Sequence, residues 1–157
     1  MESLACQVLS ACRAKSWTLA TAESCTGGMV AAALTKIAGS SDVVDCGFIT
    51  YSNTAKMQML GVSAETLQSH GAVSAQVAQE MAEGALSAAD VDITVSITGI
   101  AGPGRSEHKP EGRVCFALAQ KGNATQCETI EFGAIGRENV RQKASSFALE
   151  LFLKAAS

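Results

Sequence analysis

The sequence predicts an α/β domain, a three-layer α/β/α sandwich with a mixed, mostly parallel sheet and a late antiparallel hairpin. Short apolar runs in the first two thirds of the chain alternate with segments of helical periodicity, which favours parallel strand pairing. Two later strand-like runs, 113–120 and 125–132, are joined by Gly122-Asn123, a pair typical of tight hairpins. Hydrophobic residues make up 47% of the chain but aromatic residues only 4%, so small aliphatic side chains must fill the core.

The first third of the chain predicts two helices and two strands. Apolar residues at helical spacing over 4–12 predict the first helix, and the short run 17–20 predicts a buried strand. After a turn at Ser24, an apolar stripe from Met29 predicts a helix that ends at a glycine stop, Gly39. The run 43–51 predicts the second strand.

The rest of the chain is expected to form two short helical turns and then longer helices and strands. Short helical turns are expected over 53–60 and 64–69. Ser74 is a good N-cap for the amphipathic helix that follows it to position 86. The alternating, β-branched run 93–98 predicts a strand. After the hairpin, the last helix is expected over 137–154.

Length and composition restrict the class of protein. A chain of 157 residues fits one domain, so residues 1–157 are expected to share one core. The net charge of −3 gives no basic face for nucleic acid. No apolar run is long enough for a membrane span, and the N-terminus does not resemble a secretory signal. We therefore expect a cytoplasmic protein with neither nucleic-acid nor membrane partners.

Six scattered cysteines and two histidines give no metal signature. No Cys-x-x-Cys pair occurs, and His70 and His108 lie far apart, so we expect no metal site. Reduced thiols packed as small apolar side chains suit a cytoplasmic protein better.

The segment Thr21-Ala22-Glu23-Ser24-Cys25-Thr26-Gly27-Gly28 lies between a strand and a helix. Ser24 or Thr26 could simply cap the helix, but a hydroxyl beside free backbone N–H groups could also act as a nucleophile. Cys25 is an alternative nucleophile because a helix N-terminus lowers a thiol pKa, although nothing around it resembles a cysteine–histidine pair.

A candidate base for Ser24 is found in Tyr51-Ser52-Asn53-Thr54-Ala55-Lys56. A lysine in a water-poor pocket has a lowered pKa and can accept a serine proton. Lys56 could instead be a solvated helix residue, and Tyr51 a core aromatic residue. Together with Asn53, however, they form a denser polar group than a strand end requires.

A glycine-rich loop, Thr98-Gly99-Ile100-Ala101-Gly102-Pro103-Gly104, follows the third predicted strand. Backbone without side chains can approach a phosphate or a carbonyl group closely, but the loop could also be a flexible connection. Four basic residues could hold an anionic ligand or simply be solvated: Arg105, Lys109, Arg137 and Arg141.

Taken in order, four blocks resemble the CinA C-terminal family, whose active members are nicotinamide-nucleotide amidases. The blocks are 21–28, 47–56, 71–74, and 98–103 with Lys109-Pro110. The resemblance implies a nicotinamide mononucleotide deamidase without a cofactor, in which Ser24 is the nucleophile and Tyr51 and Lys56 assist. Alanine-rich helices leave room for a homodimer. We expect the substrate to contact a larger set of residues: Thr26, Gly27, Gly28, Asn53, Thr98, Gly99, Ala101, Gly102 and Arg141.

The chain departs from this family in three places. Glu111 and Arg113 stand where smaller or apolar residues are usual. Arg105-Ser106-Glu107-His108 interrupts the glycine-rich loop, and Gly136-Arg137 lacks the aspartate that the family often has between these residues. These departures support an alternative hypothesis, a catalytically silent relative that binds a nucleotide or a protein partner.

Overall fold

A five-stranded mixed sheet forms the centre of the computed structural model, which describes residues 1–157. Its strands are β1 (Leu19–Glu23), β2 (Val44–Ile49), β3 (Ile93–Gly99), β4 (Arg113–Gln120) and β5 (Gln126–Glu131), in the spatial order β2-β1-β3-β4-β5. β1 pairs in parallel with β2 and β3, whereas β4 is antiparallel to both β3 and β5. Four strands therefore point the same way and β4 alone is reversed, which confirms the predicted fold class.

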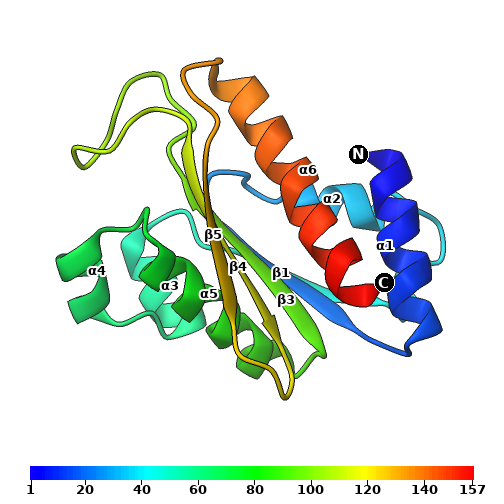
Figure 1. The fold of residues 1–157 in the computed structure, drawn as a ribbon. Coiled ribbons are helices and arrows are strands. Elements are labelled where there is room, and N and C mark those ends of the chain that lie inside the picture. The colour runs from blue at the N-terminus through cyan, green and yellow to red at the C-terminus, as the bar shows by residue number, and fades with distance from the viewer.

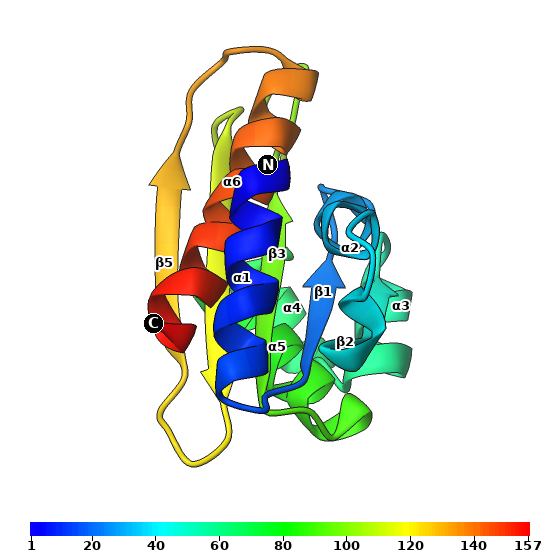
Figure 2. The same ribbon diagram turned by 90° about the vertical axis from the view of Figure 1, so that its right-hand side faces the viewer.

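Helices cover both faces of the sheet (Figures 1 and 2). One face carries α1 (Glu2–Ala14), α2 (Met29–Thr35) and α6 (Arg137–Ala156). The other carries α3 (Asn53–Leu60), α4 (Ala64–His70) and α5 (Ala75–Ala89). None of the helices combines the length and the hydropathy needed to cross a bilayer.

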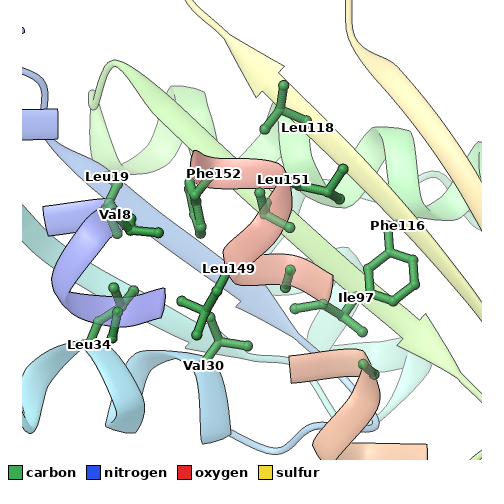
Figure 3. Packing of buried hydrophobic residues seen from close by; sticks show 14 of the residues in the cluster. Val8, Leu19, Val30, Leu34, Ile97, Phe116, Leu118, Leu149, Leu151 and Phe152 are labelled. Atoms are coloured by element: carbon green, nitrogen blue, oxygen red, sulfur yellow. The ribbon is translucent and has the colours of Figure 1, made fainter. Parts of the chain in front are cut away.

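The larger part of the core lies between the sheet and the layer of α1, α2 and α6 (Figure 3). Leu149 and Phe152 of α6 are fully buried there with Ile97 of β3. On the opposite face, small residues allow close approach: a Cβ added at Gly84 of α5 would lie 1.9 Å from the carbonyl oxygen of Leu60. A small residue at this position thus lets α5 lie close to the end of α3.

Several predicted boundaries were wrong. β1 spans Leu19–Glu23 rather than 17–20, because its polar second half pairs with β2 on one side and β3 on the other. The helix expected to reach Gly39 ends at Thr35, and a short 3-10 helix, η1 (Ser40–Asp42), follows. β2 ends at Ile49, two residues before the predicted end. The hairpin connection spans 121–125, longer than a two-residue turn.

Candidate functional site

The candidate site lies at the carboxyl edge shared by the three parallel strands. Ser24 directly follows β1, and β3 ends at Gly99. The loop after β2 leads into α3, which carries Lys56. Because parallel strands end at the same edge, residues distant in sequence meet there. The long loop after β3 and the start of α6 also lie at this end of the molecule (Figure 1).

A cavity of about 320 Å³ opens at this edge. Its volume lies within the range of about 300–1,000 Å³ that is usual for small-molecule sites. Its lining is mostly polar and comes from five regions of the chain, namely Ser24; Tyr51, Asn53 and Lys56; Ala72 and Val73; the segment from Thr98 to Glu107; and Arg137. The sequence blocks that were singled out separately therefore line one cavity.

Ser24 and Lys56 meet inside this cavity. Lys56 Nζ donates a hydrogen bond to Ser24 Oγ over 3.0 Å and a second one to the carbonyl oxygen of Thr50 over 2.8 Å. Ser52 caps α3 by accepting from the N–H of Ala55, which fixes the first turn that carries Lys56. The distance between nucleophile and base is within the range required for proton transfer.

The environment of Lys56 favours a neutral amine. Its side chain is only 2% exposed, and burial lowers its pKa below the usual value of a lysine. Glu107 acts in the opposite direction, because its negative charge favours the ammonium form. The salt bridges of the chain include no pair with Lys56, so burial dominates.

Tyr51 lines the same cavity, but its hydroxyl is not hydrogen-bonded to Ser24 or Lys56, the residues with which it was expected to act. Its hydroxyl accepts a hydrogen bond from Arg137 over 2.8 Å, and it has no hydrogen bond to Ser24 or Lys56. The side chain is 62% exposed. Arg137 also donates to the carbonyl oxygen of Gly102. Tyr51 and Arg137 thus form the outer part of the cavity, while Ser24 and Lys56 form the inner part.

The predicted free amides after Ser24 are only partly available. The fully buried carboxylate of Glu23 accepts from the N–H groups of Gly28, Val30 and Ala31. These donors at the start of α2 are therefore already bound within the protein. Sequence reasoning placed Glu23 in the motif but gave it no role.

The residues predicted to bind substrate divide into two groups. Five of them line the cavity: Asn53, Thr98, Gly99, Ala101 and Gly102. The other four do not: Thr26, Gly27, Gly28 and Arg141. The Thr26 hydroxyl donates to Glu23, while Arg141 donates to the carbonyl oxygens of Cys25 and Thr26. This second group holds the loop that carries Ser24.

Cys25 is poorly suited to be the nucleophile. It is 5% exposed, and burial raises its pKa to about 12, so the thiol stays protonated at ordinary pH. It belongs to the larger hydrophobic cluster, which also contains Val30. Between the two neighbouring candidates, the structure favours Ser24.

Among the cavity residues, Arg105 was predicted as a possible anion ligand, but its neighbours Ser106 and Glu107 were given no role in the sequence analysis. Arg105, Ser106 and Glu107 lie in the segment that departs from the family pattern, and all three line the cavity. Lys109 anchors this loop by donating to the carbonyl oxygens of His70 and Val73. The departure of this segment from the family pattern was the signal that could have identified these residues as ligands, since loop residues beside a glycine-rich turn often contact ligands.

Comparison with known proteins identifies the family. The CinA C-terminal domain family matches residues 1–156. A nicotinamide-nucleotide amidohydrolase PncC of Enterobacter agglomerans is 48% identical over 155 residues, covering 98% of this chain and 94% of the relative. The Escherichia coli K12 protein of the same name is 53% identical over 146 residues, covering 92% and 87%.

A solved structure agrees with the fold. The competence/damage inducible protein CihA from Agrobacterium tumefaciens has a TM-score of 0.94 and 46% identity, covering 99% of this chain and 94% of that one. The domain also occurs within longer chains: a CinA-like protein of Syntrophobacter fumaroxidans is 51% identical over 140 residues, which are only 32% of its length.

Proposed function

Because the chain belongs to the CinA C-terminal domain family, we propose that it is an amidohydrolase that converts nicotinamide mononucleotide to nicotinate mononucleotide and ammonia. The observation that carries this proposal is the 3.0 Å contact between Lys56 Nζ and Ser24 Oγ in a ligand-sized cavity. The names of the relatives from E. agglomerans and E. coli support the choice of substrate.

In the first half of the reaction, the neutral amine of Lys56 accepts the proton of Ser24. The serine oxygen attacks the carboxamide carbon, and the carbonyl oxygen becomes an oxyanion. When the C–N bond breaks, the Lys56 ammonium returns its proton to the leaving nitrogen, which departs as ammonia. The pyridine nucleotide is then joined to Ser24 through an ester.

In the second half, the same groups act on water. Lys56, neutral again, accepts a proton from a water molecule whose oxygen attacks the ester carbon. The bond to Ser24 breaks, Lys56 returns the proton to the serine oxygen, and nicotinate mononucleotide leaves. The scheme needs one base with a lowered pKa, which is the property that burial gives Lys56.

The outer part of the cavity suits the phosphate of the substrate. Arg105 and Arg137 both line it, and a guanidinium group can bind a phosphate through two parallel hydrogen bonds. Tyr51 orients Arg137, since its hydroxyl accepts from one of the two terminal nitrogens. We therefore assign proton transfer to Ser24 and Lys56, and substrate orientation to Tyr51 and Arg137.

The proposed setting is a homo-oligomer in the cytoplasm. The six cysteines are all unpaired, which suits a reducing compartment. Size-exclusion chromatography with light scattering tests the oligomeric state: a mass near twice that of the 16.1 kDa chain is expected, and a monomer would contradict it.

The activity is tested by measuring ammonia release from a panel of amides. The purified protein should release ammonia from nicotinamide mononucleotide much faster than from nicotinamide riboside, which lacks the phosphate, or from free nicotinamide. Thermal stabilisation by the nucleotide without ammonia release would instead favour the silent, binding-only relative.

A further inference from the structure

Glu23 is a buried carboxylate that the proposed chemistry does not use. It is fully buried at the end of β1, where an isolated charge would be very unfavourable. Five donors satisfy it, namely the hydroxyls of Thr21 and Thr26 and the N–H groups of Gly28, Val30 and Ala31. A single side chain thus ties the loop after Ser24 to the first turn of α2.

Arg141 holds the same loop through different backbone groups. From α6, its Nε donates to the carbonyl oxygen of Cys25 over 3.0 Å, and a terminal nitrogen donates to that of Thr26 over 3.3 Å. Gly27 permits this approach, because it has a φ of +59° and a Cβ there would lie 3.3 Å from the Arg141 nitrogen. Glu23 therefore holds N–H groups of this segment while Arg141 holds carbonyl groups.

After these bonds are counted, two backbone N–H groups of the segment remain without a hydrogen-bond partner in another residue. Ser24 donates its N–H to Ile97, Gly27 to Ser24, and Met29 to Thr26, while Glu23 takes the amides of Gly28, Val30 and Ala31. The N–H groups of Cys25 and Thr26 have no hydrogen bond to another residue. They directly follow the nucleophile, and in other serine hydrolases the N–H of the residue after the nucleophile is a donor to the developing oxyanion.

The contact of Arg141 also affects the strength of one of these donors. The carbonyl of Cys25 and the N–H of Thr26 belong to the same peptide group. A positive guanidinium bound to the carbonyl polarises that group and makes its N–H a better donor. Arg141 can therefore influence catalysis without touching the substrate.

We propose that Glu23 and Arg141 are positioning residues that together clamp the segment Ser24–Gly28, Glu23 through donors of the segment and Arg141 through its carbonyl groups, so that the N–H groups of Cys25 and Thr26 serve as the oxyanion hole. This proposal rests on the proposed amidohydrolase function. It also changes the role of Arg141, from a ligand of the substrate to a support for the nucleophile loop.

Two arginines one helical turn apart provide a matched test. In Arg141→Gln, kcat for nicotinamide mononucleotide should fall about 10- to 100-fold with KM within about twofold, since loss of an oxyanion donor costs about 10²–10³ in kcat and only one donor is weakened. Arg141→Lys should recover part of kcat. In Arg137→Gln the pattern should be reversed, with a raised KM and kcat largely kept. An Arg141→Gln protein with raised KM and unchanged kcat, or with both constants unchanged, would overturn the clamp.

Hydrogen exchange tests the clamp independently of turnover. In both Arg141→Gln and Glu23→Gln, the amides of 24–31 should exchange faster than in the wild type, whereas Arg137→Gln should leave them unchanged. Wild-type exchange in Arg141→Gln would contradict the clamp. If the wild type released no ammonia, the proposed function would fail, while faster exchange would still support the clamp as a structural device.

Discussion

Two loops enclose the cavity, and they are built in opposite ways. The segment Ser24–Gly28 is short and held by buried groups, with Glu23 fully buried and Cys25 5% exposed. The loop from Ile100 to Gly112 is longer, mostly exposed from Gly102 to His108, and anchored chiefly at its end by Lys109. Under the proposed function this difference corresponds to two tasks: the fixed loop would carry the reacting atoms, and the more accessible loop would contact the rest of the ligand.

Removing the proposed base, which contacts the fixed loop at Ser24, should have a larger effect than any change in the accessible loop or at Tyr51. Lys56→Met should lower kcat about 10²–10⁴-fold, because general base catalysis contributes about that much. Ammonia release from nicotinamide mononucleotide measures the loss, and circular dichroism verifies the fold. A Lys56→Met protein with more than half the wild-type kcat would show that another group accepts the serine proton.

A smaller effect is expected from a substitution of Tyr51, in the outer part of the cavity. Tyr51→Phe removes one hydrogen bond to Arg137, which is worth about 0.5–1.5 kcal/mol, so KM should rise about 2- to 10-fold with kcat nearly unchanged. Steady-state kinetics separate the two constants. A collapse of kcat with KM unchanged would place Tyr51 in the proton transfer between Ser24 and Lys56.

The charge of Glu107 connects the accessible loop with the base. Because activity requires neutral Lys56, kcat/KM should rise with pH through the lowered pKa of Lys56. Glu107 favours the ammonium form, so Glu107→Gln should lower that pKa further and move the rising limb of the profile to lower pH. Glu128→Gln on the exposed strand β5 is the control and should leave the limb in place. A shift to higher pH would contradict the assignment.

The smallest expected effect concerns stability. The hydroxyl of Thr50 is buried without a hydrogen-bond partner, whereas its backbone carbonyl binds Lys56. Thr50→Val removes the unpaired hydroxyl at similar volume, so the free energy of unfolding should rise by about 0.5–1 kcal/mol. Urea denaturation measures this change, and a loss of stability would mean that the hydroxyl has a partner in solution.

The meeting of Ser24 and Lys56 could be predicted because it depends on topology. Ser24 follows one parallel strand and Lys56 lies shortly after its neighbour, and such strands end at a common edge. The pattern of helices and strands likewise follows from local periodicity, although the ends of β1 and α2 were misplaced.

The role of Glu23 could not be predicted, because it depends on where β1 ends. With a strand placed at 17–20, Glu23 belongs to a loop, and nothing indicates that its carboxylate is buried. In the structure β1 extends to Glu23, and the side chain of this residue is fully buried. An error of three residues in the predicted end of this strand was therefore enough to miss the burial of the Glu23 side chain.

The sequence analysis placed Arg141 rather than Arg137 among the expected substrate ligands, although helical periodicity does not separate the two arginines on α6. Arg137 and Arg141 are four residues apart and share a helix face. Arg137 reaches Tyr51, while Arg141 reaches the carbonyl of Cys25, 116 residues earlier in the chain. Contacts over such separations depend on how α6 packs on the sheet, which periodicity does not determine.

The most direct test of the catalytic assignment compares two adjacent positions, Ser24 and Cys25, in the ammonia-release assay. Ser24→Ala should fold like the wild type but lose at least about a thousandfold in kcat, because the nucleophile itself is gone. Cys25→Ser should retain most of the activity, because the buried thiol stays protonated. Full activity in Ser24→Ala, or loss of activity in Cys25→Ser alone, would contradict the assignment of Ser24 as the nucleophile.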